Sequence, residues 1–107
     1  MIKVSIYRNE DNKVIGFRCA GHAGYAESGS DIICAAVSAL TMTTINSIDT
    51  FTKDTYSYDE DEAKGMMDFK IVSSLSGASE LLLNSLLLGL TGIEESYGKK
   101  YIRVDGK

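Results

Sequence analysis

Two apolar periods alternate along this chain, and their order restricts the possible folds more than any other feature of the sequence. In short segments apolar and polar residues alternate one by one, which is typical of a strand with one buried face. In longer segments apolar residues return every three or four positions, which is typical of an amphipathic helix. The first pattern predicts strands at 2–8, 14–21, 53–58, 65–72 and 101–105, and the second predicts helices at 31–49 and 76–98.

The predicted order of elements is therefore β-β-α-β-β-α-β. Polar segments at 9–13 and 59–65 predict turns, so that each pair of consecutive strands forms a hairpin. Two helices with one apolar face each can cover one side of a sheet. We expect an α+β fold with two layers, in which both helices pack on one face of a mixed four- to five-stranded sheet. The length of 107 residues suits one domain spanning 1–107.

The apolar faces of the two helices predict the core and a further contact. In the first helix, the buried stripe is expected to contain Ile33, Val37, Leu40, Thr44 and Ile48. In the second helix, the inner face is expected to contain Leu82, Leu83, Leu86, Leu90, Ile93 and Tyr97. The outer face of the second helix is more apolar than a solvated surface requires, which favours a homodimer. The residues responsible are Leu81, Leu87 and Leu88.

Charge and hydropathy exclude several classes of function. Eleven Lys and Arg residues against 15 Asp and Glu residues give a net charge of −4, whereas direct nucleic-acid binding needs a basic face. The leucine-rich segment 81–93 is shorter than the roughly 20 apolar residues that a membrane span requires. The first residues have the pattern of a strand instead of a signal peptide. We therefore expect no nucleic-acid partner, no membrane partner, a cytoplasmic location and reduced thiols.

The segment 21–38 contains the single histidine of the sequence, His22, and one of its two cysteines, Cys34. If Ser30 or Asp31 caps the following helix, Cys34 lies in the first helical turn. The positive end of the helix dipole stabilises anions there, so we expect a lowered pKa for the Cys34 thiol. The free N–H groups of that turn are also expected to bind the oxyanion that forms when a thiolate attacks a carbonyl.

His22 follows directly after the second predicted strand, so that a strand end would meet a helix start. An imidazole near Cys34 could take the thiol proton and later protonate a leaving amine. Asp31 could orient that imidazole, because it lies three residues before Cys34 on the same side of the helix. These three side chains are the candidates for a Cys–His active site.

Small residues surround the two candidate reactive groups. Gly21, Gly24 and Gly29 would allow the connecting loop at 22–31 to bend closely and to rearrange over a bound peptide. Ser38 and Thr41 lie one and two turns after the thiol on its own side of the helix. We therefore expect Gly21 to support the site, beside a flank of the helix that is small and mildly polar.

Other interpretations use the same residues. A lone cysteine is usually a small core residue, and Cys19 is expected to be buried because of its place in the alternating strand pattern. Cys19, His22, Asp31 and Cys34 could bind zinc, although the spacing lacks the usual ligand pairs. A phosphate site is disfavoured because the segment 21–40 contains no Lys or Arg. A non-catalytic dimeric interaction module that uses the second helix also stays open.

Two motifs in this segment resemble those of the ribosomal-processing cysteine protease family, Prp. The family carries Gly-His-Ala, then a loop, then Gly-x-Asp-Ile-Val-Cys-Ala-x-Val-Ser. This chain reads Gly21-His22-Ala23 and then Gly29-Ser30-Asp31-Ile32-Ile33-Cys34-Ala35-Ala36-Val37-Ser38. The one departure is Ile33 in place of valine, an extra methylene on the core face. The length, the order of elements and the Glu-Glu-Ser-Tyr end of the second helix are also similar, so the resemblance covers nearly the whole chain.

The resemblance implies an activity and a substrate. It implies a cysteine endopeptidase in which Cys34 is the nucleophile and His22 its acid–base partner, with Asp31 and Ser38 also functionally important. It further implies a homodimer, and we expect no cofactor and no metal. The implied substrate is the precursor of ribosomal protein L-twenty-seven of the large subunit, whose N-terminal extension is removed after a pair of phenylalanines. The acidic run 59–62 would attract such a basic partner, although a solvated hairpin turn is the simpler explanation.

Overall fold

Five strands and two helices occur in the part of the chain that the structure describes, residues 1–24 and 31–107 of a computed structural model. The strands are β1 (Ile2–Arg8), β2 (Val14–Ala20), β3 (Tyr56–Asp61), β4 (Met66–Ile71) and β5 (Ile102–Asp105). The helices are α1 (Ile32–Phe51) and α2 (Gly77–Tyr97). Their order along the chain is the predicted β-β-α-β-β-α-β.

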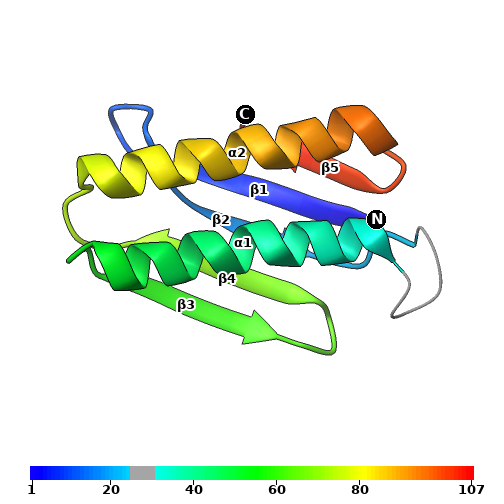
Figure 1. Cartoon of the computed structure of the whole chain (residues 1–107), viewed down its shortest axis with the longest axis horizontal. Coiled ribbons are helices and arrows are strands. Elements are labelled where there is room, and N and C mark those ends of the chain that lie inside the picture. The colour runs from blue at the N-terminus through cyan, green and yellow to red at the C-terminus, as the bar shows by residue number, and fades with distance from the viewer. Residues whose placement is uncertain (25–30) are drawn as a thin grey trace.

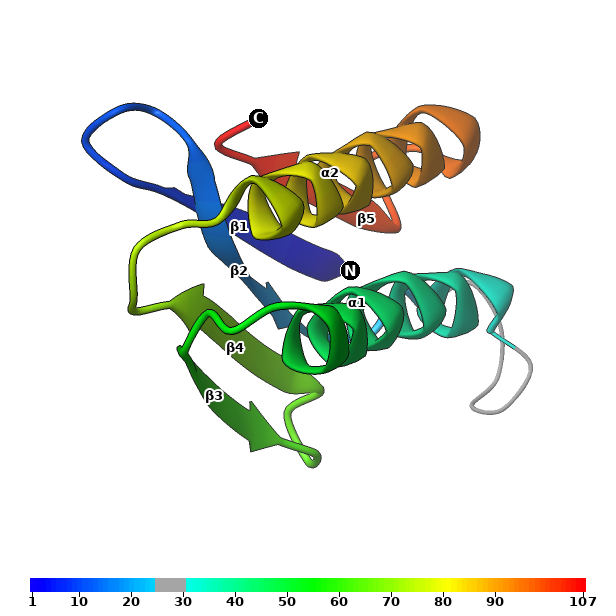
Figure 2. The same cartoon turned by 60° about the vertical axis from the view of Figure 1, so that its left-hand side comes forward.

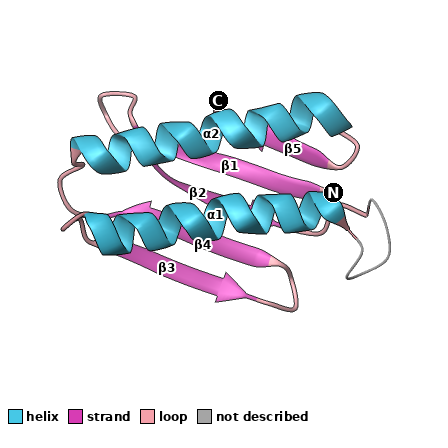
Figure 3. Cartoon of the chain, in the orientation of Figure 1, coloured by secondary structure: helices cyan, strands magenta, loops and turns pink. Residues whose placement is uncertain are grey.

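The strands form one mixed sheet in the order β3-β4-β2-β1-β5. Neighbouring strands are antiparallel except for β1 and β5, which are parallel. Both helices lie side by side on one face of this sheet (Figure 1, Figure 2). Figure 3 shows the resulting helix layer and sheet layer, and within the described residues the opposite face of the sheet carries no helix. The prediction of a two-layer α+β fold with a mixed sheet is therefore confirmed.

The core lies between the helices and the centre of the sheet. Phe17 of β2 and Phe69 of β4 face each other in register, and their ring centroids are 5.7 Å apart. Both rings are fully buried, so each contributes roughly 1.5–3 kcal/mol to the free energy of folding. The predicted stripe of α1 is buried as expected, apart from Leu40, which is half-buried and packs against Gly89 of α2.

Helix α2 has the predicted ends, and side-chain contacts explain both. Its N-cap is Ser76, whose hydroxyl accepts a hydrogen bond from the backbone N–H of Ser79. Asp54 holds this cap in place, since its Oδ2 accepts from the Ser76 N–H at 3.0 Å and from the Ser76 hydroxyl at 2.7 Å. The helix ends at Gly98, which has a φ of 102°, a value that favours glycine.

Strand β3 lies further along the chain than predicted. The sequence pattern favoured 53–58 followed by an acidic turn at 59–65, whereas the strand is Tyr56–Asp61 and the turn occupies 62–65. The acidic residues Asp59, Glu60 and Asp61 therefore pair with β4. This placement is stable because β3 is an edge strand, where charged side chains reach solvent and discourage pairing with other chains.

The prediction is wrong for one residue of α2 that was expected to lie in the core. Tyr97 is 41% exposed, and Glu94, one turn earlier, is only 4% exposed. The Glu94 carboxylate is buried because it accepts hydrogen bonds from the Val104 N–H, at 2.6 Å, and from the Lys107 ammonium. A buried carboxylate is tolerated when such donors replace the lost water. Helical periodicity could not predict the burial of Glu94, because the donors come from β5 and the segment after it.

Helix α1 is long and apolar enough to cross a membrane by length and composition alone. Core helices of water-soluble proteins commonly pass that test. In this fold Ile33, Ile45 and Ile48 of α1 are buried against the sheet and α2. The alternative cap Ser30 and the loop glycine Gly29 lie outside the described residues, so the expected rearrangement of the 22–31 loop stays a prediction.

Candidate active site

The single histidine and Cys34 line the same pocket. This pocket has a volume of about 130 Å³ and lies between the N-terminal half of α1 and one end of the sheet. Four of the predicted site residues are brought together there, namely Gly21, His22, Cys34 and Ser38. The other lining residues are Ile2, Cys19, Val37, Thr41, Gly65 and Met67. The arrangement places a thiol, an imidazole and an apolar wall around one cavity.

Asp31 is the N-cap of α1. Its Oδ1 accepts hydrogen bonds from the backbone N–H groups of Ile33 and Cys34, both at 3.0 Å. The predicted start of the helix is therefore confirmed. The carboxylate also occupies two of the N–H groups that we expected to be free for an oxyanion. That part of the prediction is wrong for this structure, because the capping side chain and a bound oxyanion would need the same donors.

The Cys34 thiol is half-buried at the rim of the apolar stripe, as its position one residue after Ile33 predicts. Its Sγ accepts a hydrogen bond from the Ala23 N–H at 3.4 Å. Burial raises the pKa of the Cys34 thiol, and the neighbouring Asp31 carboxylate adds to that increase, while the Ala23 N–H opposes it. The expected lowering of the pKa is therefore wrong. The positive end of the helix is present, but the capping Asp31 brings a negative charge to the same place.

His22 lies directly after β2, as predicted, and its side chain is exposed at the mouth of the pocket. Within the described residues, the hydrogen bonds of the Cys34 sulfur include the Ala23 N–H but not the His22 ring. Catalytic hydrogen bonds are often long in a ligand-free enzyme and shorten when substrate binds. The geometry therefore suits an imidazole that engages the thiol after a peptide has entered the pocket.

Gly21 and Ser38 both line the pocket, but Gly21 is required by the backbone and Ser38 is an exposed side chain. A Cβ at Gly21 would lie 2.4 Å from the carbonyl oxygen of Met1, and φ at this residue is +94°. Glycine is thus required where β2 turns away beside the start of β1. Ser38 is exposed one turn after Cys34 and lines the pocket.

Three pocket residues were not predicted from the sequence. Ile2 comes from β1, Met67 from β4, and Gly65 from the turn between β3 and β4. Each is remote from His22 and Cys34 along the chain, so only the strand order brings them together. Thr41, by contrast, follows from its helical spacing to Cys34. Its hydroxyl donates to the Val37 carbonyl at 2.8 Å.

Cys19 is buried in β2 as predicted, with 6% of its surface exposed. Burial raises the pKa of its thiol to about 12, so it stays protonated at neutral pH. The side chains considered as zinc ligands all lie within residues 1–24 and 31–107. In those ranges no three His, Cys, Asp or Glu side chains gather closely enough to hold a metal ion.

We expect the charge of Asp31 to restrain the reactivity of Cys34 in the resting protein. Asp31→Asn keeps an oxygen that can cap the helix but removes the charge, so the pKa of Cys34 falls and alkylation by iodoacetamide at pH 7 becomes several-fold faster. The measurement is the alkylation rate against pH, followed by mass spectrometry. Asp11→Asn changes the net charge equally at an exposed turn and serves as the control. Identical pH–rate curves for Asp31→Asn and wild type would contradict this expectation.

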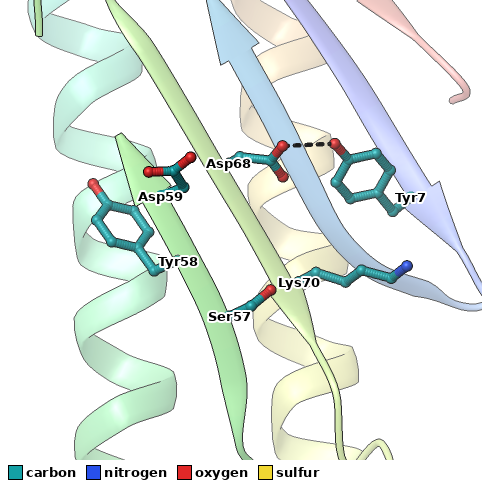
Figure 4. A pocket seen from close by; sticks show the side chains of 6 residues that line it. All are labelled: Tyr7, Ser57, Tyr58, Asp59, Asp68 and Lys70. Carbon is teal, nitrogen blue, oxygen red and sulfur yellow. Dashed lines mark hydrogen bonds between the residues drawn. The ribbon is translucent and has the colours of Figure 1, made fainter. Parts of the chain in front are cut away.

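A larger hollow of about 390 Å³ lies on the face of the sheet that carries no helix. Figure 4 shows its lining, in which the Tyr7 hydroxyl donates to Asp68 Oδ2 at 3.1 Å. The remaining side chains are Ser57, Tyr58, Asp59 and Lys70. This hollow contains neither a thiol nor an imidazole, so the smaller pocket is the better candidate for covalent chemistry.

Comparison with known proteins agrees with the fold. The family model "Cysteine protease Prp" matches residues 1–103. The ribosomal processing cysteine protease Prp of Staphylococcus aureus is 33% identical over 107 residues and is matched over the full length of both chains. The ribosomal processing cysteine protease Prp of Bacillus subtilis is 31% identical over 108 residues, which cover 97% of this chain and 96% of the relative.

Comparison with solved structures also finds similarity to Prp proteases. The S. aureus protease Prp with a covalently linked product peptide superimposes with a TM-score of 0.90 at 33% identity, over 97% of each chain. The same protease with a substrate peptide superimposes with a TM-score of 0.86 at 31% identity, over 98% of each chain. With a family match over nearly the whole chain and two helices on a five-stranded mixed sheet, this chain belongs to the cysteine protease Prp family.

Proposed function

We propose that this cysteine protease removes the N-terminal extension of the precursor of ribosomal protein L-twenty-seven, with Cys34 as nucleophile and His22 as acid–base partner. The observation that carries the proposal is the pocket that the two side chains line together. The S. aureus relatives support the substrate class, since they are ribosomal processing proteases and bind substrate and product peptides.

The reaction begins with a protonated thiol, because the pKa of Cys34 is raised by burial in the resting protein. His22 takes the thiol proton as the peptide binds, and the sulfur attacks the scissile carbonyl carbon. The leaving amine receives the proton from His22, and a thioester remains on Cys34. Water then attacks the thioester, which releases the new carboxylate and restores the thiol.

The oxyanion of each tetrahedral intermediate needs a donor near the sulfur. The Ala23 N–H is already 3.4 Å from Cys34 Sγ, whereas the Ile33 and Cys34 N–H groups are bonded to Asp31. We therefore propose the Ala23 N–H as the main hydrogen-bond donor to the oxyanion. A donor of this kind typically contributes about 3 kcal/mol to stabilisation of the transition state.

The pocket wall supports cleavage after an aromatic pair. Ile2, Val37 and Met67 give it apolar sides, and Cys19 adds a buried thiol that behaves as a small apolar group. A cavity of about 130 Å³ holds one aromatic side chain beside Cys34. The net charge of −4 further supports a basic ribosomal protein as partner.

We also propose that the protein acts as a homodimer in the cytoplasm. Leu81 and Leu88 support the dimer, because they lie two turns apart on one side of α2 and are 66% and 76% exposed. The two free thiols are consistent with a reducing compartment. Sedimentation equilibrium tests the dimer, since a monomer mass at micromolar concentrations would refute it. Cell fractionation tests the location.

A matched pair of peptides tests the proposed substrate. One peptide spans the junction between the extension and the mature ribosomal protein, and the other has alanine at both phenylalanines. We expect the first to be cut after the second phenylalanine and the second to stay intact, as measured by mass spectrometry. An intact Phe-Phe peptide would refute the substrate, and equal cleavage of both would refute the aromatic preference.

A further inference from the structure

The turn between β3 and β4 lies against the residues that carry His22. The Gly21 N–H donates to the Lys64 carbonyl at 3.2 Å, which ties the end of β2 to this turn. The turn is itself held by the Gly65 N–H, which donates to the Glu62 carbonyl at 3.1 Å. Paired strands on both sides fix its position. The turn is thus tied to the end of β2 and lies beside the exposed His22.

Gly65 is the residue of this turn that meets the imidazole. A Cβ placed on Gly65 would lie 3.0 Å from Cε1 and 3.2 Å from Nε2 of His22, and 2.9 Å from the Gly21 carbonyl oxygen. All three distances are shorter than ordinary contacts of a carbon atom. One edge of the ring therefore rests directly on the bare Cα of Gly65, and both residues line the pocket that contains Cys34.

We propose that Gly65 is a positioning residue for His22. Its missing side chain leaves the space in which the Cε1–Nε2 edge of the ring lies, and the rigid turn fixes how far the ring sits from the thiol. A side chain at this position pushes the ring and the Gly21 carbonyl away by a few tenths of an ångström. This inference rests on the proposed function, in which His22 exchanges protons with Cys34.

The test separates the side chain from the backbone conformation of Gly65. Its φ is +59°, a value that asparagine tolerates better than other residues, and Asn12 already adopts 62° in this chain. Gly65→Asn therefore adds a Cβ against the ring with little backbone strain. Gly77→Asn is the control, because it adds the same side chain at an exposed position where a Cβ meets nothing within 4 Å and where no positive φ is required.

Two measurements report on His22 itself. Because the chain has one histidine, its ring resonances in an NMR titration belong to His22 without assignment. We expect Gly65→Asn to move those resonances, to lower kcat about tenfold and to shift the pH profile of kcat/KM. Gly77→Asn is expected to leave the resonances and the pH profile unchanged.

The outcomes distinguish the inference from the function on which it rests. If His22→Ala is inactive while Gly65→Asn keeps the wild-type resonances and pH profile, the positioning role is refuted and the function stands. If His22→Ala cleaves the peptide at the wild-type rate, the acid–base role falls and the inference falls with it. A measurement on the wild type needs no variant: an NOE between the His22 Hε1 proton and the Gly65 Hα protons is expected, and its absence refutes the contact.

Discussion

Replacement of Cys34 by alanine is expected to abolish cleavage of the Phe-Phe peptide, with a loss in kcat of at least about 10⁴-fold. The estimate follows from the effect of removing a nucleophile from other proteases, where only binding and oxyanion stabilisation are left. The fold should persist, because Cys34 is half-buried at the rim of the apolar stripe. Initial rates with the junction peptide, together with the circular dichroism spectrum, provide the measurement.

Cys19→Ala is the matched control for this experiment. Both thiols line the same pocket, but the pKa of Cys19 is about 12 as a result of burial, so Cys19 cannot act as a thiolate at neutral pH. We expect Cys19→Ala to retain kcat within a few-fold and to lose some stability. Cleavage by Cys34→Ala, or an equal loss of activity in a folded Cys19→Ala protein, would contradict the assignment of the nucleophile.

Replacement of Glu94 by alanine is expected to lower the free energy of unfolding by about 2 kcal/mol. The substitution leaves the Val104 N–H without its acceptor in a buried place, and such groups typically cost about 1–3 kcal/mol. It also releases Lys107 from its partner. Urea denaturation at pH 7 measures the change. Glu95→Ala is the control, because Glu95 is exposed and its loss should change stability by less than about 0.5 kcal/mol.

The contribution of Glu94 should depend on pH in a defined direction. The Lys107 ammonium and the Val104 N–H lower the pKa of Glu94 below its usual value of 4.5. A carboxyl whose pKa is lower in the folded state stabilises the protein fully above the unfolded pKa and loses that contribution as pH falls through the folded pKa. The stability difference between wild type and Glu94→Gln should therefore shrink below about pH 4.5. A constant difference between pH 7 and pH 3 would contradict this linkage.

The order of elements could be predicted because each strand and each helix buries one face. The buried face gives a regular spacing of apolar residues, which is visible within each segment by itself. The stripe of α1, a cap at Ser30 or Asp31 and a start of α2 near Ser76 followed from spacing and residue type alone. The register of β3 was harder to predict from the sequence. The acidic residues 59–61 look like a turn in isolation, and only their position on an edge strand next to β4 explains why they are extended.

The candidate site was predictable in its reactive residues but not in its electrostatics. His22 and Cys34 were suggested by a strand end, a helix start and a small-residue loop. The pKa of Cys34 was predicted in the wrong direction, because burial of the thiol raises it and Asp31, which caps the helix, adds a negative charge nearby. Gly65 and Met67 could not be predicted at all, since they reach the pocket only through the pairing of β4 with β2.

The parallel pairing of β1 with β5 has a consequence for biosynthesis. The ribosome makes β1 before β5, so one edge of β1 has no partner until all the elements between these two strands have been translated. Ile2, which lines the pocket and pairs with Ile102, is therefore fixed in place late. A nascent copy of this protease therefore lacks this part of the pocket wall until β5 has been translated.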